Sequence, residues 1–289
     1  MGPMVHGPIA GWEVVRRAGP GRPPRIRMAG FRTAGTAPVD VRVVPHPAVS
    51  VALALGDGPR VVDTVSGRQR RGDVALGFLH GAVRVRGTGI ECIQVRLSPV
   101  VARAVLGVSP AELGNDLASL DDLWGRDARR IRHRLNETPS WEERFSLAEE
   151  LLLARAEGGR ALDPEVVRAW DLLVRTRGRA RIDALAADVG WSRKRLWTRF
   201  RAQTGIAPKR AAGLIRFDHA AHRLATGRRA AAVAAEAGYA DQSHLHRDVV
   251  AFSGVTPSTV ADGAWMAVDD VAWAVTSAAP AARTRRPGT

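Results

Sequence analysis

The sequence of 289 residues predicts an α+β protein in two parts, because its hydrophobic pattern changes along the chain. Between residues 38 and 97, short apolar runs alternate with polar residues and are separated by turns rich in glycine, proline and aspartate, as in antiparallel strands. From about residue 98 onward, apolar residues recur at helical spacing. We therefore expect a small N-terminal β-barrel or sandwich with helices, and a C-terminal all-α domain with two helix-turn-helix units joined by a linker helix.

The strands are predicted from the alternation of side chains. Val39, Val41 and Val43 alternate with polar residues, and the segment 49–55 repeats the pattern. Residues 1–37 are rich in glycine and proline, so they predict a poorly ordered lead-in with 1–19 as its flexible part. The other strand candidates lie at 61–65, 74–79, 83–86 and 90–97.

Helical signals follow the strands up to a glycine-rich loop. Ser140 with Glu143 three residues later forms a capping-box pair at the start of one helix. The AEGGR loop at 156–160 predicts a domain boundary, so we expect a first domain over 20–157, a second over 160–262 and a loose tail over 263–289. The helix candidates of the first domain lie at 99–106, 109–117, 121–136 and 140–155.

The second domain contains an internal repeat. The segment 186–191, AADVGW, matches 234–239, AAEAGY, and four further positions match after it. Each copy has a short alanine-rich helix, a glycine suited to a left-handed cap, one aromatic residue in the turn, and Ser192 or Asp241 as the N-cap of the next helix. This repeat predicts two helix-turn-helix units. We expect the helices at 163–177, 182–189, 192–203, 208–225, 229–237 and 242–252.

Charge is concentrated in the first of these units. The whole chain has 43 Lys+Arg against 29 Asp+Glu, a net charge of +14. Residues 175–223 carry 11 Arg and 2 Lys against 3 Asp, which is a net +10. The segment 224–262 has three Arg against four acidic residues and is nearly neutral. A dense basic segment on a helix-turn-helix is typical of a protein that binds a phosphate backbone.

The second helix of each unit supplies the candidate DNA contacts. Leu196 with Phe200, and Leu245 with Val249, are spaced to face the core, so the opposite stripes face outward. Their polar side chains have the geometry to read base edges, and flanking arginines suit phosphates. The predicted base contacts are Lys194, Trp197, Thr198, Arg201, Gln242, Ser243, His246 and Arg247. The predicted phosphate contacts are Arg193, Arg195, Arg199 and Arg216.

The same residues carry a family resemblance. GWSRKRLWTRFRAQTGIAPKR at 190–210 and AGYADQSHLHRDVVAFSGVTP at 237–257 resemble the DNA-binding domain of AraC/XylS-family transcription regulators. The resemblance implies two recognition helices in successive major-groove segments of promoter DNA, and activation or repression of transcription. It also implies a sensory or dimerising N-terminal domain, with a small-molecule effector, a second copy of the chain and RNA polymerase as candidate partners.

The second unit departs from the family pattern. Where the family has aromatic and basic residues, this chain has Asp248, Val249, Val250 and Ala251. We therefore expect the first unit to supply most of the affinity for DNA and the second to contribute positioning and modest base readout.

Other classes are less well supported by the residues. The single cysteine, Cys92, excludes an internal disulfide and any multi-cysteine metal site, and too few His and Glu residues lie between 38 and 97 for a metal centre. We expect no catalytic residues, no metal and no cofactor, and a cytoplasmic protein that does not enter membranes. A nonspecific architectural DNA binder and a cupin-like enzyme remain as alternatives.

Overall fold

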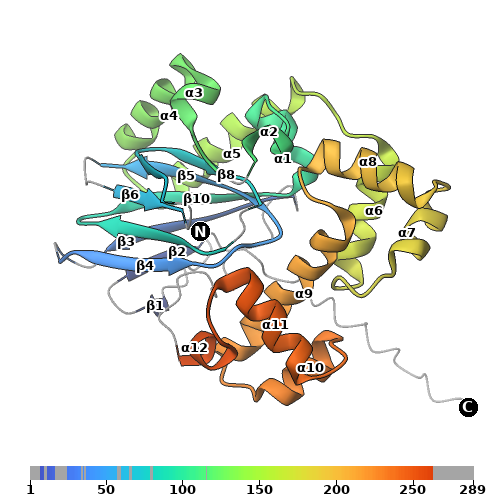
Figure 1. The fold of residues 1–289 in the computed structure, drawn as a ribbon. Coiled ribbons are helices and arrows are strands. Elements are labelled where there is room, and N and C mark those ends of the chain that lie inside the picture. Colours follow the sequence, from blue (N-terminus) through green and yellow to red (C-terminus); the bar gives the residue numbers. More distant parts are fainter. Residues whose placement is uncertain are drawn as a thin grey trace, which may run out of the picture.

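The computed structural model describes residues 7–9, 12–16, 25–33, 35, 37–56, 60–64, 67–78, 81–114 and 116–262. Its N-terminal half contains two antiparallel sheets and five helices, and its C-terminal half is helical (Figure 1). The predicted α+β class is confirmed. No helix in these ranges is long and apolar enough to span a membrane. The predicted tail at 263–289 lies outside the described residues.

The two sheets pack face to face as a sandwich. Val62 and Val83 of the smaller sheet share a buried cluster with Val74 and Leu117 of the larger one. The larger sheet pairs its strands in the order β1 (Gly7–Ile9), β2 (Trp12–Arg16), β3 (Ile26–Thr33), β10 (Glu91–Leu97), β5 (Val49–Leu55), β8 (Val74–Leu76) and β11 (Leu117–Ser119). The smaller sheet has the order β4 (Val39–Val43), β9 (Val83–Gly87), β6 (Arg60–Asp63) and β7 (Gln69–Arg71).

The N-terminal segment is more ordered than the sequence predicts. β2 and β3 both fall within the expected lead-in, and β3 pairs with β10 inside the larger sheet. Ala29, Gly30 and Phe31 are buried in succession, because helices cover one face of β3 and the smaller sheet covers the other. A strand buried on both faces has no apolar–polar alternation, so the pattern that revealed the other strands is absent here.

Five helices complete the N-terminal half. They are α1 (Pro99–Leu106), α2 (Pro110–Leu113), α3 (Leu120–Trp124), α4 (Arg126–Glu137) and α5 (Trp141–Glu157). The helix expected at 109–117 ends at Leu113, and the chain then forms β11. The helix expected at 121–136 is two helices, because Gly125 adopts φ 56° between them. The capping pair at Ser140 is confirmed, since its hydroxyl accepts from the Glu143 N–H at 3.2 Å.

Gly30 allows α5 to lie close against β3. A Cβ atom at this position would lie 2.4 Å from the ring of Trp141, which is itself buried. We therefore expect Gly30→Ala to lower the free energy of unfolding by about 1–3 kcal/mol, as overpacking does in a filled core. Urea denaturation measures the change. Gly158→Ala is the matched control, because its Cβ would meet only carbonyl oxygens at 4.0 Å; equal stability of the two variants would contradict this packing.

The C-terminal half consists of two helix-turn-helix units and a linker. Gly190 and Gly238 adopt φ 67° and 79° in the two turns, as the repeat predicted. The linker helix between the units, α9, has the bounds expected from the sequence. The helices are α6 (Pro164–Arg175), α7 (Ile182–Asp188), α8 (Arg193–Thr204), α9 (Pro208–Ala225), α10 (Ala230–Ala237), α11 (Gln242–Ser253) and α12 (Pro257–Asp262).

The two halves are joined by packing and polar contacts. α1 and α2 lie against α8, where the Ser109 hydroxyl donates to the Ala202 carbonyl at 3.0 Å. Near the other end of the junction, His46 Nδ1 donates to the Asp218 carboxylate of α9 at 2.7 Å. The first helix-turn-helix unit and the linker helix are therefore both docked on the N-terminal half.

Candidate nucleic-acid interface

α8 presents an exposed basic face opposite a buried apolar one. The Ser192 hydroxyl caps the helix by accepting from the Arg195 N–H at 3.2 Å. Leu196 and Phe200 are fully buried and fix the rotation of the helix. The structure places the four predicted base-contacting residues of this helix together on the exposed side: Lys194, Trp197, Thr198 and Arg201.

Trp197 is the most unusual member of this face. It is 47% exposed, although tryptophan is usually largely buried. The guanidinium carbon of Arg201 lies 5.1 Å from the centre of its ring, which is within the range of a cation–π contact. The pair forms a flat apolar surface with an attached positive charge, which suits contact with a thymine methyl group and a neighbouring base edge.

The flanking arginines of α8 are exposed and partly engaged within the protein. Arg193 lies 3.1 Å from Asp183, and the Arg195 guanidinium stacks over Trp191 at 4.7 Å. Arg199 lies 2.6 Å from Asp163. These exposed contacts contribute little to stability, so the three side chains can exchange them for phosphates at small cost.

Arg216, the fourth predicted phosphate contact, lies apart from this face. Its guanidinium donates to the Gly178 carbonyl at 2.9 Å and lies over Tyr239 at 5.7 Å. It is also 3.9 Å from Asp248 of α11, and its side chain is only 22% exposed. These contacts tie the linker helix to both helix-turn-helix units.

α11 repeats the geometry of α8 with less charge. The Asp241 carboxylate caps the helix by accepting from the His244 N–H at 2.6 Å, and Leu245 and Val249 are buried. Arg247 is the one cation of the exposed stripe, and Asp248 follows it directly. The four predicted residues Gln242, Ser243, His246 and Arg247 are all exposed.

A buried charged cluster behind α9 was not found by sequence reasoning. Arg96 of β10 is 1% exposed, and the side chains of His46 and Asp218 are 2% and 4% exposed. Burial and the nearby Arg96 charge lower the pKa of His46 to about 4, so this ring is neutral at pH 7. The pKa of Asp218 is also lowered, because the His46 hydrogen bond and nearby positive charges outweigh the effect of burial. The cluster therefore buries the Asp218 carboxylate with neutral His46 as its hydrogen-bond donor, within the field of the Arg96 charge.

This cluster predicts a dependence of stability on pH. The His46 pKa is about 4 in the folded protein, below the ordinary value of 6.5, so between these values the unfolded chain binds the extra proton. We therefore expect the free energy of unfolding to fall as the pH falls through this window, by up to about 1.4 kcal/mol per pH unit.

Urea denaturation at several pH values tests this expectation. His46→Asn keeps an N–H donor and removes the titration, so its slope between pH 6.5 and 4 should be smaller. A residual slope of the same sign should come from His219, whose pKa is also lowered to about 4 by burial, Arg223 and Arg177. An unchanged slope in His46→Asn would refute the assignment.

A small cavity lies between the two sheets. Its volume is about 80 Å³, and its walls are mainly valine, leucine and aromatic side chains. Its polar lining residues include His46, Ser50, Arg60, Cys92 and Gln94. Cys92 is buried, and burial raises the pKa of its thiol. His46 thus borders the cavity and also contacts α9.

Comparison with known proteins agrees with the geometry of the C-terminal half. A family described as "Helix-turn-helix domain" matches residues 185–262. Comparison with curated protein sequences gives no match. Residues 185–262 therefore form a helix-turn-helix domain, a class of domain that binds DNA. Two units joined by a linker helix are the arrangement that the sequence predicted for this domain.

Solved structures give more distant likenesses. ToxT from Vibrio cholerae is 14% identical, over 82% of this chain and 98% of that chain, with a TM-score of 0.45. The C-terminal domain of AraT, a response regulator from Geobacillus stearothermophilus, is 21% identical over 35% of this chain and 86% of that chain, with a TM-score of 0.34. The AraC-like transcriptional activator CuxR is 13% identical over 68% of this chain and 73% of that chain, with a TM-score of 0.28. Since all three TM-scores are below 0.5, the assignment of residues 185–262 to a helix-turn-helix domain rests on the family match.

Proposed function

We propose that the protein binds specific DNA sites through α8 and α11, which enter successive major-groove segments on one side of the duplex. The observation that carries this proposal is the exposed face of α8, where four side chains suited to base edges lie opposite a fully buried core. In the proposal, Lys194, Trp197, Thr198 and Arg201 read bases. Arg193, Arg195 and Arg199 bind phosphates.

The second unit has a smaller part in the proposal. Gln242, Ser243, His246 and Arg247 add base contacts from α11, but the adjacent carboxylate of Asp248 limits its attraction to DNA. Arg216 acts within the protein, because its contacts with Gly178 and Asp248 fix the spacing of the two recognition helices. The proposal thus changes the role that the sequence suggested for Arg216.

The N-terminal half is proposed to control this activity, either by binding a small molecule or by dimerisation. The inter-sheet cavity supports the first route, because its polar residues include His46, which contacts α9. A ligand that displaces His46 would change a contact of the linker helix. We propose that the domains extend over 20–157 and 160–262, with the protein acting in the cytoplasm beside RNA polymerase and without catalysis of its own.

Selection of bound sites from a random DNA pool tests the proposal. A sequence-specific regulator should enrich one motif with two half-sites about one helical turn apart, since each unit reads one groove segment. The selected duplex should then survive competition by excess random DNA at about 150 mM salt. Recovery of no motif, with binding that random DNA abolishes, would support a nonspecific architectural binder instead.

A further inference from the structure

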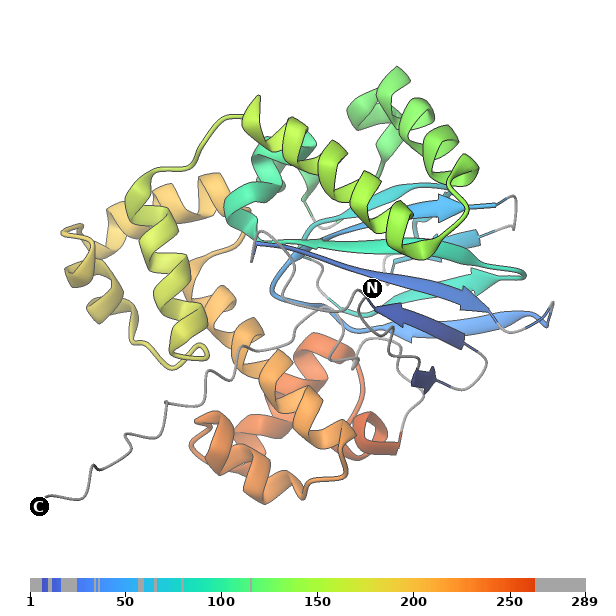
Figure 2. The same ribbon diagram turned by 180° about the vertical axis from the view of Figure 1, so that it is seen from behind.

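A hollow lies at the junction between the two halves, separate from the inter-sheet cavity. Its volume is about 470 Å³, which is within the range of sites for small molecules. The N-terminal half forms one wall with α1, α2 and the loop before α6, and α8 forms the other wall. Figures 1 and 2 show α1 and α2 beside α8, so the hollow lies next to the first recognition helix.

Two close backbone contacts fix the walls of this hollow. A Cβ atom at Gly159 would lie 2.3 Å from the Cα atom of Ala104, so the loop that carries Arg160 rests directly on α1. A Cβ atom at Gly205 would lie 2.7 Å from the carbonyl carbon of Pro110, so the end of α8 rests on α2. Because the walls are held in contact, the side chains around the hollow are preorganised for a ligand.

The acidic groups of the walls are already paired within the walls. The Ser109 N–H donates to Glu112 Oε1 at 2.9 Å, and the Gln203 amide oxygen accepts from the Asp163 N–H at 2.8 Å. The Asp163 carboxylate also lies 2.6 Å from the Arg199 guanidinium. Both carboxylates of the hollow therefore have partners without a ligand.

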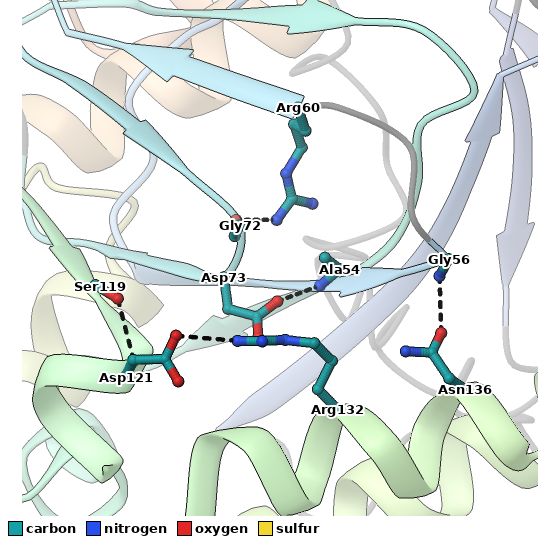
Figure 3. Close-up of polar contacts among 9 residues, drawn as sticks. All are labelled: Ala54, Gly56, Arg60, Gly72, Asp73, Ser119, Asp121, Arg132 and Asn136. Atoms are coloured by element: carbon teal, nitrogen blue, oxygen red, sulfur yellow. Dashed lines mark hydrogen bonds and ion pairs between the residues drawn. The ribbon is translucent and has the colours of Figure 1, made fainter. Parts of the chain in front are cut away.

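Two arginines of the walls have no such partner. Arg103 of α1 is half-buried and Arg160 of the loop is exposed, and neither side chain forms an ion pair or hydrogen bond with any residue that the structure describes. Arg132 of α4, which is also half-buried, shows the usual arrangement, because its guanidinium donates to Asp73 at 2.6 Å and to Asp121 at 3.2 Å (Figure 3). The hollow therefore contains two positive charges that no described carboxylate neutralises.

A phosphate group is the ligand that matches this arrangement. A carboxylate is filled by the planar fork of one guanidinium, whereas a tetrahedral phosphate has oxygens for two guanidinium groups that approach from different elements. We propose that Arg103 and Arg160 bind a phosphate group in the hollow between α1 and α8. The phosphate belongs either to the DNA backbone or to a small phosphorylated molecule, since both sources present the same chemistry.

Each source predicts a different measurement. Phosphate contacts with DNA release counterions, so the loss of two contacts should make the affinity for DNA less dependent on salt. A small molecule bound in the hollow should stabilise the folded chain, because it binds the folded state and not the unfolded one. The site goes beyond the contacts proposed for α8 and α11, since both arginines belong to the N-terminal wall of the hollow.

Arg103→Gln combined with Arg160→Gln is the variant that removes both charges and keeps polar side chains. The control is Arg129→Gln combined with Arg134→Gln, which removes the same charge from exposed residues of α4. This helix lies on the side of the molecule away from α8 (Figures 1 and 2). Without phosphate, both variants should melt within about 2 °C of wild type, because surface substitutions of this kind change stability little.

Inorganic phosphate is the probe for the first measurement. It is titrated against each protein in thermal unfolding, with chloride used to keep the ionic strength constant. If the source is a small molecule, saturating phosphate should raise the melting temperature of wild type and of the control by about 2–4 °C. The shift of the double variant should be less than about half as large, because the two guanidinium groups that hold the phosphate are absent.

A random-sequence duplex is the probe for the second measurement. Fluorescence anisotropy at several salt concentrations gives the slope of log affinity against log salt concentration. If the source is DNA, the double variant should bind about tenfold more weakly than wild type at about 150 mM salt, with a slope smaller by about 1–2. The control should match wild type. The same loss is expected with the selected duplex, because phosphate contacts carry no sequence information.

Either effect, or both, supports the phosphate site and identifies its source. The proposal is overturned if the double variant matches wild type in both measurements, or if the control variant loses as much as the double variant. Neither measurement needs a selected DNA site. Failure to recover a motif would therefore count against the proposed function and leave the phosphate site standing.

Discussion

Replacement of Asp218 by alanine is expected to lower the free energy of unfolding by about 1–3 kcal/mol, because the change leaves the buried N–H of His46 without its acceptor. Arg96 and Asp218 are both almost fully buried, and the His46 ring donates to the same carboxylate at 2.7 Å. Urea denaturation at pH 7 measures the loss. Asp218→Asn keeps an acceptor for His46 but removes the charge, so its cost should be intermediate.

An exposed carboxylate provides the comparison. Asp188 lies 2.6 Å from Arg168 on the surface, with side chains 30% and 62% exposed. Asp188→Ala should change stability by less than about 1 kcal/mol, as exposed ion pairs do. If Asp218→Ala were no more costly than Asp188→Ala, the buried cluster would not contribute to the stability of the junction.

Replacement of Lys194 and Arg201 by alanine is expected to weaken binding to the selected DNA about 100-fold. Each side chain lies on the exposed face of α8, and a good contact with a base edge contributes about 1–3 kcal/mol. The corresponding pair on α11, Gln242→Ala with Arg247→Ala, should cost less than about tenfold, because that helix carries little net charge. Fluorescence anisotropy at about 150 mM salt measures both, since affinity depends on ionic strength.

A distant arginine controls for the loss of charge alone. Arg84 lies on the smaller sheet, with its side chain 51% exposed and paired with Asp40. Arg84→Ala should leave the affinity for DNA nearly unchanged. A larger loss from the α11 pair than from the α8 pair would reverse the ranking of the two units.

The helix-turn-helix helices could be predicted closely because their ends are marked by local chemistry. Ser192 and Asp241 cap the recognition helices, and Gly205 and Gly254 end them with φ 81° and 74°. The bounds of α9 follow from Pro208 at its first position. Such signals depend on a few adjacent residues, so a single sequence contains them in full.

The features that could not be predicted depend on tertiary contacts. β3 lacks alternation because both of its faces are covered, so its burial depends on elements far along the chain. His46 and Asp218 are separated by 172 residues, and aspartate is a residue type usually found at the surface. Arginine is usually found at the surface, and contacts with Gly178, Tyr239 and Asp248 hold the Arg216 side chain inside the fold.

The placement of the candidate DNA contacts followed from the same logic. The outward stripes of α8 and α11 could be derived because one buried pair determines the rotation of each helix. The pair is Leu196 with Phe200 in α8 and Leu245 with Val249 in α11.

The junction between the two halves also has a thermodynamic consequence. Buried side chains from the larger sheet, from α1 and α5, and from both helix-turn-helix units belong to one continuous cluster. Elements that share a core unfold together, so heating should give a single calorimetric transition with equal calorimetric and van't Hoff enthalpies. A fragment starting at residue 160 would lack the hydrogen bond from His46 to Asp218 and the one from Ser109 to the Ala202 carbonyl. The isolated fragment should therefore melt at a lower temperature than the full chain. The cooperativity of the chain therefore makes the stability of the recognition helices depend on the integrity of the sheets.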